Sequence, residues 1–290
     1  MSQIILRNDK LSLGILPDCG GSLSFFKYFG EDILRPSNES EKNANQSAMF
    51  VMIPYTSFIS NGKFPFFGIS RSVSVNSNIS QYPIHGDVWN QKLQVIHQDN
   101  TSVELQLTHK KEDGFPYNYT AGIIYKLEQD KLIITLKLKN DTPLPMPYGM
   151  GLHPFFKNNK KTMIQYNTQN IWYRGDDPIM GQPYPLPKEL NFSAPKTLPR
   201  TTTNISMGNW DGIAQVIQED YSITIQAGDS MHHLTLYIPR GKDFFCLEPV
   251  SHTPDAFNLA AQGIIGTGIQ TLGPNENISN TITFTLKGKQ

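Results

Sequence analysis

The sequence predicts an all-β fold, a large antiparallel β-sandwich with few short helices. Three observations lead to this prediction: apolar and polar residues alternate with a period of two, turn residues separate the alternating segments, and helical signals are few. The 22 glycines and 20 prolines are scattered between these segments and do not gather into a linker. We therefore expect a single β-sandwich domain over residues 1–290.

The alternating segments define the expected strands, at residues 103–107, 134–138, 223–225, 234–238 and 281–286. A period of two places one side of each strand on a core and the other in water, as antiparallel sheets require. Segments 128–130 and 227–230 are typical of hairpin turns that join neighbouring strands. Thr253 as N-cap and Pro254 in the first turn predict a short helix that ends near residue 261.

Composition excludes several classes of function. Charged residues make up 17% of the chain, and 25 Lys and Arg balance 25 Asp and Glu, so nothing favours nucleic acid or an acidic membrane as partner. No apolar run is long enough to span a bilayer and the first residues do not resemble a signal peptide, which predicts a cytoplasmic protein. Cys19 and Cys246 lack metal-ligand spacing and are expected to be free, buried thiols.

No motif for a metal or a cofactor is present in the sequence. It contains neither HExxH nor an Asp-x-Asp calcium loop, and it lacks a GxGxxG, a Walker loop and a GxSxG elbow. We therefore expect no cofactor and no metal. Composition alone does not exclude a Ser-His-Asp triad.

His153 is the first candidate for catalysis. It follows Gly149 and Gly151, precedes Pro154, and is followed by two phenylalanines. Glycines let the backbone approach a ligand closely, and Pro154 restricts the conformation of His153. A histidine held in such a cleft suits general acid or base catalysis, since its ordinary pKa is near neutrality. The alternative is a turn histidine with a structural hydrogen bond.

Glu248, His85 and Trp89 are further candidates. Glu248 ends an apolar segment, where burial would raise its pKa toward the range of a general base, unless the side chain points to solvent. His85 and Trp89 lie close together beside Gly86, and Trp89 offers a flat apolar face that suits a sugar ring. The alternative for this stretch is a loop with a core tryptophan.

An ordered set of motifs resembles the aldose 1-epimerase family of the galactose mutarotase-like superfamily. The set comprises Pro-Ile-His-Gly at 83–86, Gly-Leu-His-Pro-Phe-Phe at 151–156, Leu-Glu-Pro-Val-Ser-His-Thr-Pro-Asp-Ala-Phe-Asn at 247–258, and a closing region at 266–274. Each motif alone has little specificity, but the ordered set is specific and covers nearly the whole chain. The resemblance implies a β-sandwich that needs no cofactor and interconverts the α and β anomers of free aldoses.

The resemblance also implies residue roles. His153 would protonate the ring oxygen, and Glu248 would take the proton of the anomeric hydroxyl. The ring would then open to an aldehyde, the C1–C2 bond would rotate, and the ring would close with the roles reversed. His85 would hydrogen-bond sugar hydroxyls and help hold the developing charge. We expect a monomer or homodimer.

Two positions depart from the family pattern. An Asn-Arg pair is usual where this chain has Ser57 and Phe58, and Phe58 cannot replace the charge-assisted hydrogen bonds of an arginine. Lys63 or Arg71 are possible sources of the missing charge. The usual sugar-binding aspartate aligns with Asn204, which keeps an acceptor but loses the charge.

Asp211, before Gly212, is an alternative ligand in that region, although a turn role is the simpler interpretation. Both departures affect sugar binding more directly than the acid–base pair, so they predict altered specificity or a raised Michaelis constant. They also motivate a second hypothesis, a carbohydrate-binding protein that has lost turnover. A hexose-6-phosphate epimerase is disfavoured by the absent arginine, and a lyase or glycosidase accessory domain by the two acid–base motifs.

Overall fold

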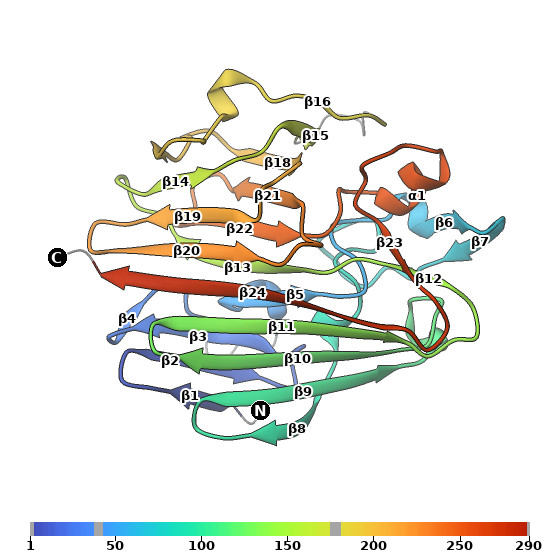
Figure 1. Ribbon diagram of the computed structural model, residues 1–290, viewed down its shortest axis with the longest axis horizontal. Helices are drawn as coiled ribbons and strands as arrows, with labels where there is room; N and C mark the ends of the chain where they lie inside the picture. Colours follow the sequence, from blue (N-terminus) through green and yellow to red (C-terminus); the bar gives the residue numbers. More distant parts are fainter. Residues whose placement is uncertain (1–2, 38–42, 175–180, 289–290) are drawn as a thin grey trace.

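The structure, a computed structural model, describes residues 3–37, 43–174 and 181–288 (Figure 1). Within these residues two large antiparallel sheets pack face to face, accompanied by two small two-stranded sheets and one α-helix, α1 (Ala256–Ala261). Short 3-10 segments lie at η1 (Ala44–Gln46), η2 (Ser60–Gly62), η3 (Val88–Asn90), η4 (Lys111–Asp113) and η5 (Lys188–Leu190). The predicted all-β antiparallel sandwich is confirmed.

The eleven-stranded sheet carries the site described below. Its order is β1 (Ile4–Arg7), β2 (Leu11–Leu16), β3 (Ser22–Tyr28), β5 (Met49–Met52), β13 (Gly151–Lys157), β22 (Phe244–Val250), β21 (His233–Ile238), β18 (Thr203–Gly208), β15 (Asn170–Arg174) and β16 (Tyr184–Pro185), with β4 (Glu31–Asp32) paired to β3. β13 and β22 lie next to each other in the interior of this sheet, although they are far apart in the sequence.

The nine-stranded sheet covers the other side of the core, and Figure 1 shows it crossing in front of the larger sheet. Its order is β17 (Lys196–Thr197), β14 (Met163–Tyr166), β19 (Ile213–Ile217), β20 (Tyr221–Ala227), β24 (Asn277–Gly288), β11 (Lys131–Asn140), β10 (Tyr119–Glu128), β9 (Ser102–His109) and β8 (Gln94–Gln98). The small sheets pair β12 (Met146–Tyr148) with β23 (Gln270–Leu272), and β6 (Lys63–Phe66) with β7 (Ile69–Ser72).

The alternation seen in the sequence produces the core between the sheets. On β11 every second residue is buried, from Leu132 to Leu138, while the residues between them are more exposed. Apolar side chains from Ile4 to Leu286 join one hydrophobic cluster that includes strands of both sheets. Burial of each large aliphatic or aromatic side chain contributes about 1.5–3 kcal/mol, so this cluster dominates the stability of the fold.

One of the two predicted hairpins is correct. β10 and β11 pair along their whole length, and Gln129 adopts a positive φ of 51° in the turn between them. The second prediction is wrong, because segment 227–230 joins β20 of one sheet to β21 of the other. Both strands bury alternate residues in the shared core, so the alternation pattern does not distinguish a hairpin from a crossing between sheets.

The predicted helix exists but begins later than expected. Asp255, in the left-handed region with φ of 55°, precedes α1, so Thr253 is not the N-cap. The backbone N–H of Thr253 instead donates to the carbonyl oxygen of Thr267. The carboxylate of Asp255 accepts hydrogen bonds from Ser60 N and from the side chain of Asn258. This segment therefore ties the start of α1 to the loop before β6.

Two other predictions concern membranes and cysteines. Within the described part of the chain, no helix is both long and apolar enough to cross a membrane. Cys19 and Cys246 are free and buried, as expected. A single domain over the whole chain and a location in the cytoplasm stay predictions.

Candidate active site

Strand register brings the main candidates together on one face of the eleven-stranded sheet. β13 pairs with β22 so that Gly151 faces Val250 and Phe155 faces Cys246, which places His153 opposite Glu248. β21 and β18 continue the same row, with Thr235 beside Glu248 and Ser206 beside Thr235. We call this row, His153, Glu248, Thr235 and Ser206, the floor. It borders a cavity of about 320 Å³.

His153 and Glu248 form a direct polar contact. The Nε2 atom of His153 lies 3.4 Å from an oxygen of Glu248, and both side chains are buried. The ring of Phe50, from β5, stacks on the imidazole of His153 with centroids 4.5 Å apart. The register of three adjacent strands and this stacked ring therefore fix the orientation of His153.

Burial disfavours charge on both members of the pair. It raises the pKa of Glu248 to about 8. It also lowers the pKa of His153 well below its usual value, and the neighbouring His85 lowers this pKa further. A protonated carboxyl beside a neutral imidazole and a carboxylate beside an imidazolium carry the same number of protons. Each has one proton more than a carboxylate beside a neutral imidazole. Burial therefore favours the protonated carboxyl beside the neutral imidazole, an arrangement that differs from the ion pair only in which residue holds one proton.

His85 reaches the cavity from a loop with an unusual backbone. Its φ is 61°, in the left-handed region that non-glycine residues rarely adopt. Its N–H donates to the carbonyl oxygen of Ser57, and Ser57 N–H donates back to Nδ1 of His85. Since Nδ1 accepts this bond, we assign the proton of the neutral ring to Nε2. Burial lowers the pKa of His85 to about 3, so the ring is a neutral donor.

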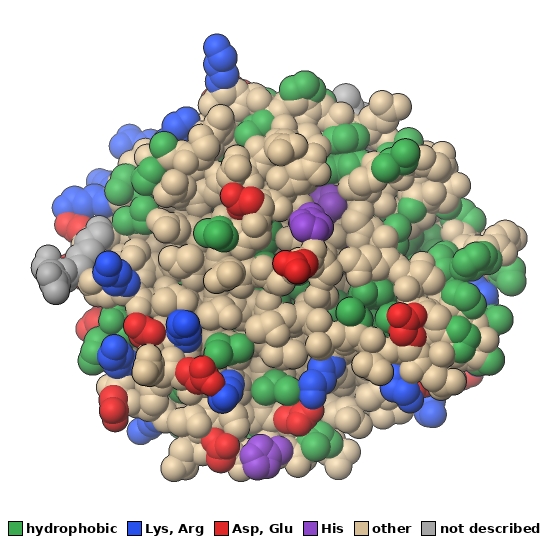
Figure 2. Space-filling view, viewed as in Figure 1, with side chains coloured by type: hydrophobic (Ala, Val, Ile, Leu, Met, Phe, Trp, Pro, Cys, Tyr) green, Lys and Arg blue, Asp and Glu red, His purple; other side chains and the backbone are tan. Residues whose placement is uncertain are grey.

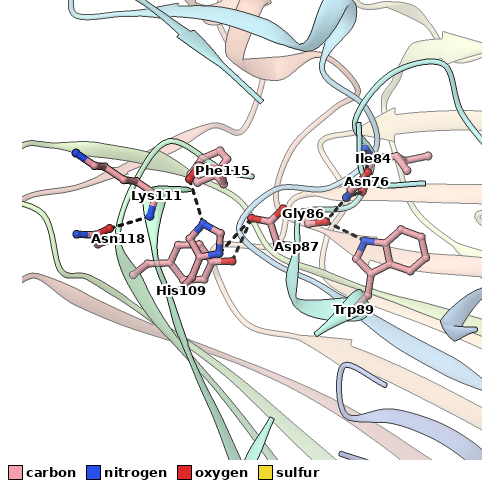
Figure 3. A network of polar contacts seen from close by, with 10 residues as sticks. Asn76, Ile84, Gly86, Asp87, Trp89, His109, Lys111, Phe115 and Asn118 are labelled. Atoms are coloured by element: carbon pink, nitrogen blue, oxygen red, sulfur yellow. Dashed lines mark hydrogen bonds and ion pairs between the residues drawn. The ribbon is translucent and has the colours of Figure 1, made fainter. Parts of the chain in front are cut away.

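Asn76 holds the loop that carries His85 (Figure 3). Its Nδ2 group donates to the carbonyl oxygens of Ile84 and Gly86 at 2.8 and 2.5 Å, and its Oδ1 accepts from Ile84 N at 2.9 Å. These bonds bracket His85 on both sides. Side-chain amides that satisfy backbone groups in this way fix a loop that no strand supports.

A second buried cluster holds Asp87, which lies in the same loop two residues after His85. Asp87 lies 3.6 Å from Nδ1 of His109, and the Nε2 atom of His109 contacts the carbonyl oxygen of Phe115 (Figure 3). The hydroxyl of Tyr119, whose ring stacks on His109, donates to Asp87. The segment from 84 to 87 is therefore anchored by Asn76 on one side and by β9 and β10 on the other.

The glycines near His153 do not serve the role predicted from the sequence. A Cβ atom on Gly149 would lie 1.9 Å from the ring of His252, and one on Gly151 would contact Val250 and Met52. These glycines therefore make room for protein side chains and not for a ligand. His252 lines the cavity, accepts a hydrogen bond from Thr56 N at its Nε2, and contacts the carbonyl oxygen of Thr253 through Nδ1.

The side of the cavity that departs from the family pattern is largely apolar. Phe58 and Asn204 both line it, and the ring of Phe58 packs near those of Tyr82 and Tyr173. The described lining contains neither Lys nor Arg. Lys63 and Arg71 do not line it, and the guanidinium of Arg71 lies over the ring of Tyr117. Neither of the two possible sources of the missing charge therefore lies in the described lining.

Trp89 and Asp211 lie outside the cavity lining, contrary to the prediction that they contact substrate. Trp89 is 1% exposed, its Nε1 donates to Gly86 O, and its ring stacks on Phe50 at 5.2 Å. It therefore supports the loop of His85 from below. Asp211 is exposed and accepts a hydrogen bond from Ile213 N, which is the turn role given above as the simpler interpretation.

Several lining residues were not singled out from the sequence. Thr235 and Ser206 line the cavity because cross-strand pairs continue the row of Glu248. Tyr237 lines it from a second row, in which it pairs with Asn204. The alternation at 234–238 was visible, but the face that these residues share depends on a register between distant strands. We use the name wall for five loop residues of the lining, Thr56, Ser57, Phe58, Ile84 and His85.

One group of side chains in the described part of the chain has the spacing of metal ligands. The donor atoms of His153, Cys246 and Glu248 lie within 4.8 Å of one another, and all three residues are buried. Imidazole, thiolate and carboxylate together suit a zinc-like ion. Burial raises the pKa of Cys246, which opposes the thiolate that such an ion needs. The direct contact within the His153–Glu248 pair suits proton transfer without an ion.

The fold and the cavity define a class, a two-sheet β-sandwich with a buried histidine–glutamate contact in the interior of one sheet. The family model for aldose 1-epimerase matches residues 2–285, so the chain belongs to the aldose 1-epimerase family.

Known proteins of similar length and fold resemble this chain. The uncharacterized protein YphB of Escherichia coli K12 is 27% identical, with 99% of both chains covered. The crystal structure of a galactose mutarotase-like protein from Clostridium acetobutylicum is similar with a TM-score of 0.83 at 17% identity, covering 99% and 95% of the two chains. The galactose 1-epimerase from Lactobacillus acidophilus has a TM-score of 0.79 at 14% identity, with the same coverage. At these identities the two structures establish the shared fold alone.

Proposed function

We propose that this protein is an active aldose 1-epimerase, which interconverts the α and β anomers of a free aldose. The observation that carries the proposal is the contact of His153 with Glu248 on the floor of a cavity lined by hydrogen-bonding side chains. The ring oxygen and the hydroxyl oxygen of a hemiacetal share one carbon. An acid and a base that act on them must therefore lie close together, as these two residues do.

The proposed reaction conserves one proton. Glu248 takes the proton of the anomeric hydroxyl while protonated His153 donates to the ring oxygen. The bond between C1 and the ring oxygen breaks, and C1 becomes an aldehyde carbon. The pair is then a neutral imidazole and a protonated carboxyl, the form that burial favours. Rotation about C1–C2 and the reverse transfers close the ring from the other face.

Other lining residues would bind the sugar. His85 would donate from Nε2, and Asn204 and Thr235 would contribute an amide and a hydroxyl. The apolar side at Phe58 would contact C–H groups of the ring. Since the described lining lacks a cation, the cavity suits a neutral aldose better than a phosphorylated one.

Polarimetry of freshly dissolved α-glucose and α-galactose tests the proposal. We expect wild-type protein to accelerate the change in rotation, and His153→Ala and Glu248→Gln each to reduce kcat by about 100-fold or more, since general acid–base groups contribute about 10²–10⁴-fold. Asp211→Asn, outside the cavity, is the matched control and should retain the wild-type rate. Treatment with EDTA should leave the rate unchanged, because proton transfer needs no ion.

The second candidate, a sugar-binding protein without turnover, is motivated by Phe58 in place of arginine. Calorimetric titration of the same samples with each sugar separates the two candidates. Saturable binding together with a rate at the uncatalysed level in the wild-type protein would favour the binding protein. Equal rates in wild type and both variants would contradict catalysis for these sugars.

A further inference from the structure

Three turns meet at one end of the sandwich and form a groove that is separate from the cavity. They are the turn from β13 to β14, the segment from β17 to β18, and the turn from β21 to β22. The groove has a volume of about 660 Å³ and shares no lining residue with the cavity. Its size lies within the range of small-molecule sites, about 300–1,000 Å³.

Hydrogen bonds hold these turns together. Asn158 N donates to Asp243 O at 2.7 Å, which joins the turn after β13 to the turn before β22. Leu198 N donates to Thr162 O, which joins the third segment to the first. The side chain of Gln218 accepts from Asn159 and donates to Lys157 O. The fold therefore holds the backbone of these turns together before any ligand arrives.

All charged side chains in the lining are positive. Lys160, Arg200, Arg240 and Lys242 come from all three turns, and no Asp or Glu is among the described lining residues. None of these four cations forms an ion pair with another described residue, although the whole chain has no net charge. Figure 2 shows Lys and Arg side chains gathered along the upper left edge, where the turn into β14 lies in Figure 1.

The electrostatic repulsion within a cluster of like charges is reduced when an anion binds among them. Like charges on one surface repel each other, and among the described residues no carboxylate forms an ion pair with these four cations. By contrast, some other lysines at the surface are paired, such as Lys126 with Glu128 and Lys139 with Asp141. The unpaired cluster therefore favours a ligand with more than one negative charge.

The uncharged lining narrows the class of ligand. Threonine hydroxyls and asparagine amides, at Thr197, Thr201, Thr202, Asn158 and Asn159, alternate with a few aliphatic residues. No aromatic side chain lies in the described lining, so the groove offers no platform on which a nucleobase would stack. We propose that this groove binds a small polyol that carries two or more phosphate groups, outside the cavity of the acid–base pair.

Calorimetric titration at low ionic strength tests this proposal with three probes. Fructose 1,6-bisphosphate supplies hydroxyls and two phosphates, inorganic pyrophosphate supplies charge alone, and sucrose supplies hydroxyls alone. We expect saturable binding of the bisphosphate with a Kd below about 1 mM, weaker binding of pyrophosphate, and none of sucrose. Raising the salt to about 0.5 M should weaken the binding at least tenfold, since salt screens exposed charges.

A matched pair of triple variants locates the site. Arg200→Gln, Arg240→Gln and Lys242→Gln together should weaken bisphosphate binding at least tenfold. Arg7→Gln, Lys92→Gln and Lys131→Gln remove the same charge elsewhere and should leave the Kd unchanged. Circular dichroism of both variants checks that they fold. Equal affinity in the two variants, no saturable binding to wild type, or pyrophosphate binding as tight as the bisphosphate would overturn the proposal.

Discussion

The floor and the wall of the cavity are built by different means. The floor lies on three interior strands and the neighbouring β18, and the register between them sets the distance from His153 to Glu248. The wall lies on loops, where side chains such as Asn76 and His252 hold the backbone in place. The floor retains the residues expected for proton transfer, whereas the wall carries the departure at Phe58.

This difference indicates which properties of the site can change independently. A strand residue on the floor cannot shift without changing the ladder on both sides, so the proton-transfer geometry is tied to the fold itself. Loop residues of the wall lie outside the ladder of the sheet, so we expect their replacement to affect the sheet less. We therefore expect changes in the wall to alter sugar binding and changes in the floor to remove turnover.

Asn76→Ala should have the largest effect among changes that leave the floor and the cavity lining intact. It removes the hydrogen bonds that hold Ile84 and Gly86 on either side of the strained His85. We expect kcat/KM for the best sugar to fall about tenfold or more and the free energy of unfolding to fall by about 1–3 kcal/mol.

Kinetics and urea unfolding of the same samples measure both effects of Asn76→Ala. Asn90→Ala removes an exposed amide that donates to Asn76 O and is the control, with little change expected. An unchanged kcat/KM in a destabilised Asn76→Ala would show that the clamp serves stability only.

The pH dependence of stability tests the burial of His252, which lines the cavity and bonds Thr56 of the wall. Burial lowers the pKa of His252 to about 4, whereas an unfolded histidine titrates near 6.5. The unfolded state therefore takes up a proton at a higher pH than the folded state does. The resulting stabilisation is complete above pH 6.5 and is lost as the pH falls toward 4, by up to about 3 kcal/mol.

Urea unfolding between pH 7.5 and 4.5 measures this slope. His252→Asn should reduce the loss of stability on acidification, because the group that titrates is gone. His97→Asn, at an exposed position, should keep the wild-type slope. Identical slopes for His252→Asn and wild type would contradict a neutral, buried His252.

The smallest effect is expected from restoring the usual residue of the wall. Phe58→Arg would place a cation and several donors beside the cavity, at the position where the family usually has arginine. We expect KM for glucose or galactose to fall several-fold with little change in kcat, because the acid–base pair is unaffected. A comparison with Phe58→Lys separates the effect of the paired N–H donors of the guanidinium from the effect of positive charge alone. A large rise in kcat would show that the wall takes part in turnover.

Some of these features could be predicted from the sequence and others could not. The alternation in β11 predicted its buried face, because that pattern depends only on neighbouring residues. The crossing at 227–230 was missed, because the same alternation occurs in strands of either sheet. Trp89 was assigned to the cavity on chemistry, but it is packed below the loop of His85, and only tertiary contacts determine such a position. His153 and Glu248 were identified individually, while their contact depends on pairing between distant strands.

The most direct test of the central claim is a double-mutant cycle on the floor. The mutarotation rate would be measured by polarimetry for wild type, His153→Ala, Glu248→Gln and the double variant. If the pair acts as one unit with one mobile proton, the double variant should be about as slow as the slower single variant. Independent losses that multiply in the double variant, or a double variant that turns over faster than the slower single variant, would contradict the account.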